Sequence, residues 1–311
     1  GRGEEGRARG AVKTLDIVVP AYDEESSIAP LYARLRRVLD DLPYRARVIF
    51  VDDGSRDRTA EVVTTLARED ARVGLVRLSR NFGHQVALTA GLDATTADAV
   101  ITMDADLQHP PEKLPAFVAA WEAGAEVVSG VRASSARVGF FKRASSAVFY
   151  RLLNSMSAHP ITLDSPDFRL FDRRVVQAIG QVRERSRFLR GIYAWVGFRQ
   201  AEVPYTEEDR AAGSTHYSTL AMFLLALSAI LSFSRAPLRL ATYLGLLVSG
   251  LAFAFGLYAL AMNLIFHEVI RGWTSLAVLV SFLSGVQLLT LGVLGEYLGQ
   301  VLEEAKARPL Y

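Results

Sequence analysis

Cysteine is the first thing this sequence lacks, because none of its 311 residues is one. Its absence excludes disulfides, zinc–thiolate sites, iron–sulfur clusters and thiol catalysis. A dominant charge is missing too, since 35 lysines and arginines against 33 acidic residues leave a net charge of +2. This balance argues against a nucleic acid partner held by broad phosphate neutralisation. Any anionic ligand must therefore be met by a local group of residues.

Two common phosphate-binding signatures are also absent. The loop after the first predicted strand reads PAYDEES and carries no Gly-x-Gly-x-x-Gly, and no Gly-x-x-x-x-Gly-Lys-Ser/Thr occurs in the sequence. A dinucleotide oxidoreductase and a P-loop nucleotidase are therefore poor matches. We expect phosphates to be neutralised by a metal ion and arginines instead. The opening GRGEEGRARG has neither apolar periodicity nor the hydrophobic centre of a signal peptide, so residues 1–13 are predicted to form a disordered tail.

From Leu15 onward, short β-branched runs alternate with amphipathic stretches. Strands are predicted at LDIVVP, ARVIFVDD, VGLVRLS, ADAVITMDAD and AEVVSG, and helices over 26–41, 57–70, 111–121 and 137–157 and after Gly83. This order predicts an α/β domain over residues 14–213, with a mainly parallel sheet and ligands at the carboxyl ends of its strands.

Three long uncharged runs follow the α/β region. They contain 17 residues (218–234), 28 residues (240–267) and 24 residues (272–295). As helices the last two would be about 42 and 36 Å long, enough to cross a hydrocarbon core of about 30 Å. We predict a transmembrane hairpin over 240–299 and an interfacial helix within the juxtamembrane segment 214–239. A third span and a buried soluble hairpin are the alternatives.

The charges that flank these runs indicate the orientation of the hairpin. Arg235 and Arg239 precede it, and Lys306 and Arg308 follow it, whereas the short connecting loop carries only Arg271. By the positive-inside rule, the α/β domain and the C-terminal tail, residues 300–311, are expected on the cytoplasmic side of the inner membrane.

Two carboxylates one residue apart, Asp104 and Asp106, follow the predicted strand ADAVITM, with Gln108 just beyond them. Carboxylate oxygens at a strand exit suit a hard divalent cation such as Mg²⁺, which completes its coordination with water and substrate phosphates. The pattern therefore predicts a site that clamps a diphosphate through a metal ion. Two solvated loop acids are the alternative.

Two further acidic segments lie at the exits of other predicted strands. They are PAYDEE, residues 20–25, and VDDGSRDRT, residues 51–59. Because the carboxyl ends of parallel strands meet at one edge of a sheet, three acidic clusters are expected to converge there. Their carboxylates can accept hydrogen bonds from a base and a ribose, and Tyr22 offers an aromatic face for stacking. Some of these side chains are also expected to cap the helices that follow.

Several segments, taken in order along the chain, form a recognisable series. They are VVPAYDEE, VDDGSRDRT, RNFGHQVALTAGL, MDADLQHPPE, PDFRLFDRRVV, RFLRGIYAWVGF, RAAGSTHYS and GEYLGQVLEEAKARPLY. This series resembles the polyisoprenyl-phosphate glycosyltransferases of glycosyltransferase family 2. Within that family the chain looks most like bactoprenol glucosyltransferases, and more distantly like dolichol-phosphate mannose synthase. The resemblance covers roughly residues 14–311.

The resemblance implies a GT-A catalytic domain, Rossmann-like, that uses a nucleotide sugar and Mg²⁺ or Mn²⁺, followed by interfacial and membrane helices, often in a homotetramer. By position it implies catalytic roles for Asp104, Asp106 and Asp167, with Gln108 joining the first two at the metal. It implies nucleotide binding by Pro20, Tyr22, Glu24, Asp52 and Asp53, and phosphate or acceptor binding by Arg132, Arg137, Arg169, Arg210, Ser214 and His216.

Three positions depart from the family pattern. Asp23 stands where Asn is common, His109 where Asp is frequent, and His216 where a lysine is usual. The last change matters most, because a histidine is only partly protonated near neutral pH. A surface imidazole at the membrane boundary is the alternative for His216.

The expected reaction is inverting transfer of a hexose from a UDP-sugar, foremost UDP-glucose, to a polyprenyl phosphate in the lipid bilayer. Asp167 could act as a base or could orient Arg169, and both possibilities stay open at this point. GDP-mannose or UDP-N-acetylglucosamine is the alternative donor. A processive polysaccharide synthase is disfavoured because Gln-x-x-Arg-Trp is absent. A non-catalytic scaffold is disfavoured because both metal carboxylates are present, and a transporter because the membrane runs lack interior charges.

Overall fold

The computed structural model describes two compact units of the chain. The first contains the described residues up to 207 together with Pro309–Tyr311, and the second contains those from 238 to 308. The described residues are 12–133, 166–185, 187, 189–207, 238, 241–243, 245, 247–248, 250–251, 253–255, 257–258 and 272–311.

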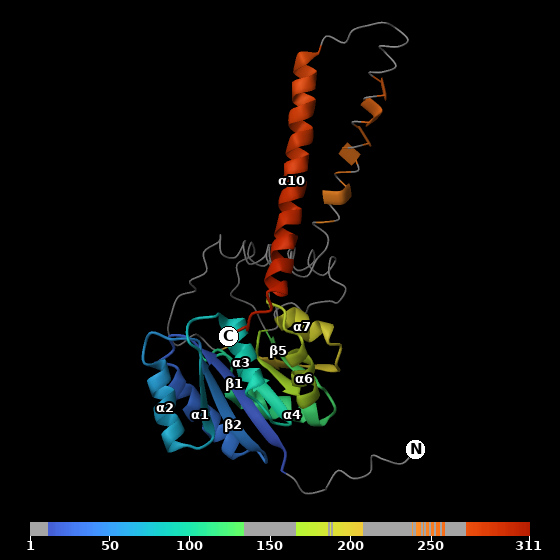
Figure 1. Ribbon diagram of the computed structural model, residues 1–311. Coiled ribbons are helices and arrows are strands. Elements are labelled where there is room, and N and C mark those ends of the chain that lie inside the picture. The colour runs from blue at the N-terminus through green and yellow to red at the C-terminus, as the bar shows by residue number, and fades with distance from the viewer. Residues whose placement is uncertain are drawn as a thin grey trace. The chain divides into compact units, whose positions relative to one another are not determined.

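The first unit is built on one seven-stranded sheet with the order β3-β2-β1-β4-β6-β5-β7 (Figure 1). The pairs β1–β2, β1–β4, β2–β3 and β5–β7 are parallel, whereas β6 runs antiparallel to both β4 and β5. The α/β fold is thus confirmed, with a mixed sheet. The strands are β1 (Thr14–Ala21), β2 (Arg45–Asp52), β3 (Val73–Arg77), β4 (Ala99–Thr102), β5 (Val127–Arg132), β6 (Arg169–Asp172) and β7 (Gln200–Tyr205).

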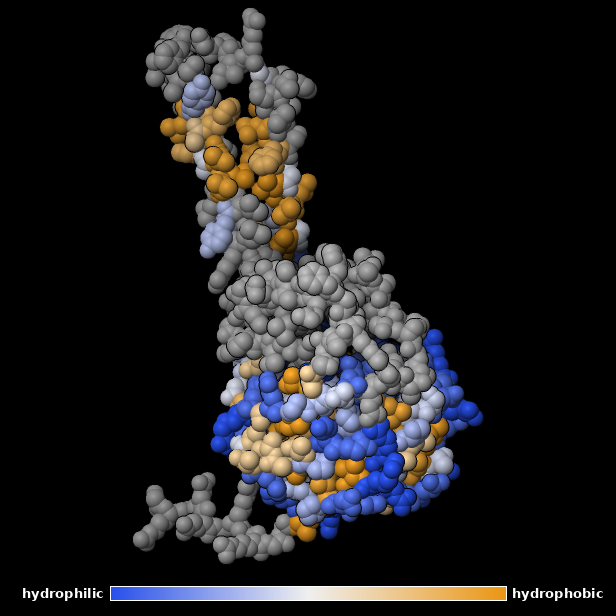
Figure 2. Space-filling model, turned by 180° about the vertical axis from the view of Figure 1, so that it is seen from behind, coloured by the Kyte–Doolittle hydropathy of each residue, from blue (hydrophilic) through white to orange (hydrophobic). Residues whose placement is uncertain are grey.

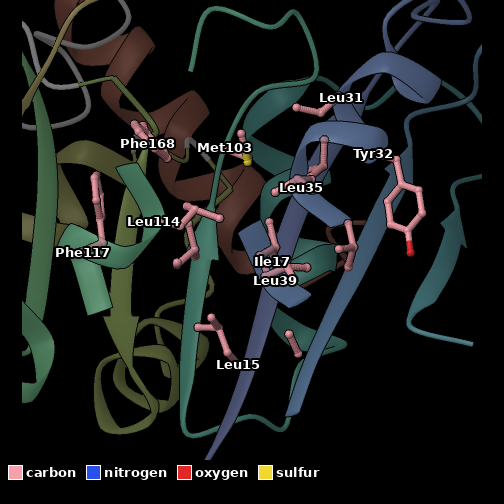
Figure 3. Close-up of a cluster of buried hydrophobic side chains, with 14 of the residues drawn as sticks. Leu15, Ile17, Leu31, Tyr32, Leu35, Leu39, Met103, Leu114, Phe117 and Phe168 are labelled. Carbon is pink, nitrogen blue, oxygen red and sulfur yellow. The ribbon is translucent and has the colours of Figure 1, made fainter. Parts of the chain in front are cut away.

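Helices cover both faces of this sheet because its central strands are apolar on both sides. In β1, Ile17 and Val19 pack into one buried cluster and Val18 into another. The first cluster lies under α1, α2 and α4, and Figure 3 shows Ile17 of β1 beside Leu39 of α1. The second lies under α3, α6 and α7. The helices are α1 (Ile28–Asp40), α2 (Thr59–Glu69), α3 (His84–Asp93), α4 (Leu114–Glu122), α6 (Arg173–Gln181) and α7 (Leu189–Trp195), with a 3₁₀ turn at Pro111–Lys113 before α4.

Most described elements up to β5 match the predicted ones within a few residues. The helices predicted over 26–41 and 57–70 are α1 and α2, and the one predicted over 111–121 is the 3₁₀ turn together with α4. The elements β6, α6, α7 and β7 were not expected from the sequence, and the helix predicted over 137–157 lies outside the described residues.

The second unit contains one long helix, α10 (Trp273–Ala305), of 33 residues. Its segment Phe282–Ala305 is the only stretch of the described residues long and apolar enough to cross a membrane, with a mean hydropathy of 1.3. Figure 2 shows the hydrophobic side chains gathered along the described parts of this unit. The helix continues ten residues past the predicted end of the span at Gly295 and includes the start of the predicted tail. Only part of the predicted first span, 240–267, is described.

An arginine side chain ties the end of α2 to the end of α1. Arg72 Nη2 donates to Asp70 Oδ2 at 2.8 Å, and Arg72 Nη1 donates to Asp40 Oδ1 at 2.7 Å. The hydrogen bonds from Arg72 lower the pKa of Asp70, against the opposing effect of burial. A carboxyl with a lowered folded-state pKa contributes stability at neutral pH that is lost as the pH falls through that value.

We therefore expect Asp70→Asn to lower the free energy of unfolding by about 1–2 kcal/mol at pH 7. The difference from wild type should shrink from about pH 5 downward, because the wild-type carboxyl then becomes protonated on unfolding. Urea unfolding of the full chain in detergent at pH 7 and pH 3 measures this. Asp41, which is exposed and follows Asp40 in the sequence, provides the control variant Asp41→Asn. A difference in unfolding free energy that stays constant down to pH 3 would contradict a lowered pKa of Asp70 in the folded state.

Candidate active site at the carboxyl edge of the sheet

The loops that leave β1 and β2 are joined by hydrogen bonds. Asp23 N donates to Ser55 Oγ at 3.1 Å, and Asp23 Oδ1 accepts from Arg56 N at 2.7 Å. Next to them Glu24 N donates to Thr59 Oγ1 at 2.8 Å. Asp23 has a positive φ of 55°, a conformation that Asp adopts more readily than most residues. Two of the three predicted acidic segments are therefore held side by side.

The predicted nucleotide residues of the first loop lie at the end of β1 and just after it. Pro20 is buried in the strand, while Tyr22 is 37% exposed, so its ring is open to solvent. Glu24 accepts a hydrogen bond from Ser27 Oγ at 2.6 Å. Asp57 Oδ1 accepts from Thr59 N, the first amide of α2, at 2.9 Å, whereas the N-cap residues of α1 and α2, Ser27 and Arg58, make no side-chain capping hydrogen bond.

Asp52 ends β2 and Asp53 follows it, and both are almost fully buried. Asp52 Oδ1 accepts from Ser55 N at 2.9 Å. The carboxylate of Asp53 accepts from Phe82 N at 2.7 Å and from Gly83 N at 2.8 Å. Asp53 thus fixes the loop between β3 and α3, a function that the sequence did not indicate. Nucleotide binding by these two residues stays a prediction.

Gly54 allows the loop after β2 to approach the loop between β3 and α3. Its φ is +69°, and a Cβ built there would lie 2.4 Å from the carbonyl carbon of Arg80. An L-residue with a side chain disfavours this φ, and no side chain fits against the backbone at this distance. Only glycine suits the position without movement of a loop.

The segment after β4 carries Asp104, Asp106 and Gln108, as predicted. Gln108 N donates to Asp106 Oδ1 at 3.1 Å, and Leu107 between them has a positive φ of 66°. Asp104 Oδ1 is buried and accepts no hydrogen bond from the described residues. A buried carboxylate oxygen without a donor suits a hard cation. Asp104, Asp106 and Gln108 are therefore fit to hold Mg²⁺ or Mn²⁺, although no group of three or more His, Cys, Asp or Glu in the described ranges forms a complete protein site.

His109 supports this segment through a buried side chain. Its ring is stacked on Phe168 with centroids 4.9 Å apart, and its Nδ1 accepts from Asp104 N at 3.0 Å. Burial lowers the pKa of His109, in keeping with a neutral imidazole that accepts at Nδ1. The histidine at this position, a departure from the family pattern, therefore accepts a hydrogen bond from the backbone of Asp104, the first of the two predicted metal carboxylates.

We expect His109→Phe to lower the free energy of unfolding by about 1–3 kcal/mol, because the Asp104 amide loses its acceptor while the ring packing is kept. Urea unfolding of the full chain in detergent measures the loss. Tyr205→Phe is the matched control. Tyr205 packs edge-on against His109, and the change leaves the hydrogen bond from Asp104 N to His109 Nδ1 intact. Equal losses in the two variants would show that the Nδ1 acceptor contributes nothing.

A second histidine connects Asp104 with Asp167. The Nε2 atom of His84, at the start of α3, lies 3.6 Å from Asp104 Oδ1 and 3.3 Å from Asp167 Oδ2. Burial disfavours the charged imidazole, but the hydrogen bond to Asp167 and the charges of both acids outweigh it and raise the pKa of His84. His84 was not among the site residues predicted from the sequence. The signal available was its position just after Gly83, in a segment already matched to the family.

Asp167 is buried just before β6 and is surrounded by donors. Besides His84, Gln85 Nε2 lies 3.4 Å and Arg190 Nη2 3.5 Å from its Oδ2 atom. Burial disfavours ionisation, yet the His84 hydrogen bond and the charges of Arg190, His84 and Arg169 outweigh it and lower the pKa of Asp167. Asp167 is thus held as a carboxylate.

The predicted phosphate-binding arginines have different surroundings. Arg132, at the end of β5, pairs with Glu207 at 2.8 Å. Arg169 is buried in β6, where Nη1 donates to Ser129 Oγ at 3.0 Å and the guanidinium lies 5.1 Å from the centre of the Tyr193 ring. Burial lowers the pKa of Arg169. The other predicted residues, Arg137, Arg210, Ser214 and His216, lie outside the described residues.

The chain is similar to known glycosyltransferases in sequence. Residues 16–180 match the family described as glycosyl transferase family 2. An uncharacterised glycosyltransferase of Bacillus subtilis, YkcC, is 43% identical over 95% of this chain and 91% of its own length. The bactoprenol glucosyl transferase of Shigella phage SfX is 40% identical over 96% and 97%.

Among solved structures, glucosyl-3-phosphoglycerate synthase from Mycobacterium tuberculosis, in complex with Mn²⁺, UDP-glucose and phosphoglyceric acid, is similar with a TM-score of 0.47. The two share 17% identity over 70% of this chain and 78% of that one. The family match spans more than half of the chain, and the relatives are similar over nearly all of it. The chain therefore belongs to glycosyltransferase family 2 and is a glycosyltransferase.

Proposed function

We propose that this glycosyltransferase transfers a hexose, foremost glucose from UDP-glucose, to the phosphate of a polyprenyl phosphate, with inversion at the anomeric carbon. The observation that carries the proposal is the pair Asp104 and Asp106 beside two joined acidic loops at the carboxyl edge of the sheet. It is supported by relatives at 40% identity that are named bactoprenol glucosyl transferases.

The donor would lie across this edge. Tyr22 would stack on the base, while Glu24, Asp52 and Asp53, with Pro20 shaping the loop, would line the nucleoside site. Asp104, Asp106 and Gln108 would hold Mg²⁺ or Mn²⁺, which supplies positive charge to the leaving diphosphate. Arg132 would share that charge from the end of β5.

The acceptor differs chemically from a sugar hydroxyl. A phosphate monoester already carries negative charge near neutral pH, so its oxygen attacks without a base to remove a proton. The task of the protein is to bring two anions together, which requires cations. Arg137, Arg169, Arg210, Ser214 and His216 are proposed for the acceptor phosphate, with Arg169 acting from its buried position.

The acceptor's hydrocarbon tail places the reaction at a membrane. The apolar part of α10 supports membrane association. We propose in addition that 240–267 forms a second span, that 214–239 lies at the interface, and that the catalytic unit and the C-terminus are in the cytoplasm. A homotetramer in the inner membrane is the assembly we propose.

Transfer of radiolabel into an organic-extractable lipid tests the proposal. Purified full chain in detergent, polyprenyl phosphate and Mg²⁺ or Mn²⁺ would be supplied in turn with UDP-glucose, GDP-mannose and UDP-N-acetylglucosamine. We expect UDP-glucose to give labelled lipid and EDTA to stop the transfer. Label from another donor alone would replace the sugar in the proposal. No labelled lipid from any donor, with folded protein and both metals tried, would overturn the lipid acceptor.

A further inference from the structure

One oxygen of Asp167 has no function in the arrangement described so far. Three donors surround Oδ2: His84 at 3.3 Å, Gln85 at 3.4 Å and Arg190 at 3.5 Å. The other oxygen, Oδ1, is buried and accepts no hydrogen bond from the described residues. A buried carboxylate oxygen that loses water without gaining a donor costs about 1–3 kcal/mol. The position thus points to a ligand that brings a donor.

The surroundings hold this carboxylate in one place. Thr102 Oγ1 at the end of β4 donates to the backbone oxygen of Asp167 at 2.6 Å. Gln85 is itself fixed, because its Oε1 accepts from Leu189 N at 3.0 Å at the start of α7. Three elements, β4, α3 and α7, therefore fix the direction of the free oxygen. A carboxylate held this firmly is typical of a site that recognises a ligand, whereas a carboxylate that only contacts solvent needs no such support.

The distance to Asp104 indicates what the ligand is. One His84 nitrogen lies 3.3 Å from Asp167 Oδ2 and 3.6 Å from Asp104 Oδ1, so these two oxygens are at most about 7 Å apart. If Asp104 binds the donor diphosphate through a metal, the two groups attached to that diphosphate, the nucleoside and the hexose, both lie within such a distance of Asp104. The nucleoside is proposed to bind at the loops after β1 and β2, whereas Asp167 precedes β6, on the other side of β4 in the sheet. The group nearer to Asp167 is then the hexose, whose hydroxyls are neutral donors.

We propose that Asp167 Oδ1 accepts a hydrogen bond from one hydroxyl of the donor hexose and so takes part in choosing the sugar. The inference rests on the proposed function and assigns the part of the donor that Asp167 reads. A phosphate is excluded as its partner, since two anions would repel each other. A sugar hydroxyl keeps its proton and satisfies the oxygen.

The experiment measures donor binding without any acceptor. Titration calorimetry of the full chain in detergent with Mn²⁺ would compare UDP, UDP-glucose and the 2-, 3-, 4- and 6-deoxyglucose analogues of UDP-glucose. In wild type we expect one deoxy donor to bind about 10- to 100-fold more weakly than UDP-glucose, as a hydrogen bond to a charged group implies. In Asp167→Asn this penalty should fall below about threefold, with the affinity for UDP and for Mn²⁺ unchanged.

Asp172→Asn is the matched control. Asp172 lies at the other end of β6, where its carboxylate accepts hydrogen bonds from Trp121 Nε1 and Arg174 N. The Asp172→Asn variant should keep the full loss of affinity for the deoxy donor. If Asp167→Asn does not fold, Asp167→Ser and the wild-type deoxy series still decide the question. A wild type that binds all deoxy donors like UDP-glucose overturns the proposal.

Three other outcomes also contradict the hexose contact. Loss of UDP or Mn²⁺ affinity in Asp167→Asn would assign the residue to the nucleotide or the metal. Unchanged donor binding with a fall in kcat would assign it to proton transfer. If no UDP-sugar binds more tightly than UDP, the titrations are repeated with GDP and GDP-mannose. GDP-mannose that binds no more tightly than GDP would then overturn the proposal. A chain that discriminates hydroxyls but labels no lipid would instead contradict the polyprenyl acceptor alone.

Discussion

Replacing Asp106 by asparagine is expected to lower glycosyl transfer by at least about 10³-fold, and Asp104→Asn should do the same. Each change keeps the shape of the side chain but removes a negative charge from the proposed metal site. The developing charge on the leaving diphosphate would then lose the group that neutralises it. Initial rates of labelled lipid formation at saturating donor measure the effect.

Glu112→Gln is the control for both variants. Glu112 belongs to the same segment, pairs with Arg34 on the surface and has a side chain that is 55% exposed. It should change the rate by less than about twofold, since an exposed ion pair contributes little. Excess Mn²⁺ should recover part of the activity of Asp106→Asn if the loss lies in metal affinity. Asp106→Asn with near wild-type rates at limiting Mn²⁺ would rule out the proposed site.

Gly54→Ala is expected to be the most destabilising single-methyl change in the loops around the site. The added Cβ would lie 2.4 Å from the backbone of Arg80, and that backbone cannot move without disturbing the hydrogen bonds from Phe82 and Gly83 to Asp53. We expect a loss of at least about 3 kcal/mol in unfolding free energy. Weaker binding of UDP should accompany it.

Gly83→Ala separates the two causes of this loss. Gly83 also has a positive φ, +96°, but a Cβ built there would meet nothing within 4 Å. With ψ at 153° this backbone conformation suits glycine almost exclusively, so the change should cost about 1–3 kcal/mol, for the backbone conformation alone. Thermal unfolding and UDP titration of both variants in detergent make the comparison. Equal losses would mean that the approach of the two loops at Gly54 is not close.

The local pattern of apolar residues was sufficient to predict the strands and helices with strong periodicity. The apolar alternation of LDIVVP predicted β1, and the amphipathic run after it predicted α1. The position of Asp104 and Asp106 at a strand exit followed from the same reading. By contrast, β6 has four residues and pairs antiparallel to its neighbours, so neither its length nor the βαβ order indicated it.

The contacts that complete the site could not be predicted for a different reason. His84, Gln85, Asp167 and Arg190 come from three separate parts of the chain, and only the packing of α3 and α7 around β6 brings them together. The attachment of Asp53 to Phe82 and Gly83 likewise depends on the approach of two loops. The chemistry of these residues is visible in the sequence, whereas their pairing is a property of the tertiary structure.

The joined loops after β1 and β2 have a consequence for amide hydrogen exchange. The amides of Asp23, Glu24 and Arg56 belong to loops, yet Asp23 and Arg56 each donate to a side chain of the opposite loop, and Glu24 donates to Thr59, the first residue of α2. Their exchange with solvent deuterium requires both loops to separate, so the protection of these amides should rise and fall together. A nucleotide bound across the two loops should slow all three by a common factor, which makes them a direct reporter of donor binding in the absence of turnover.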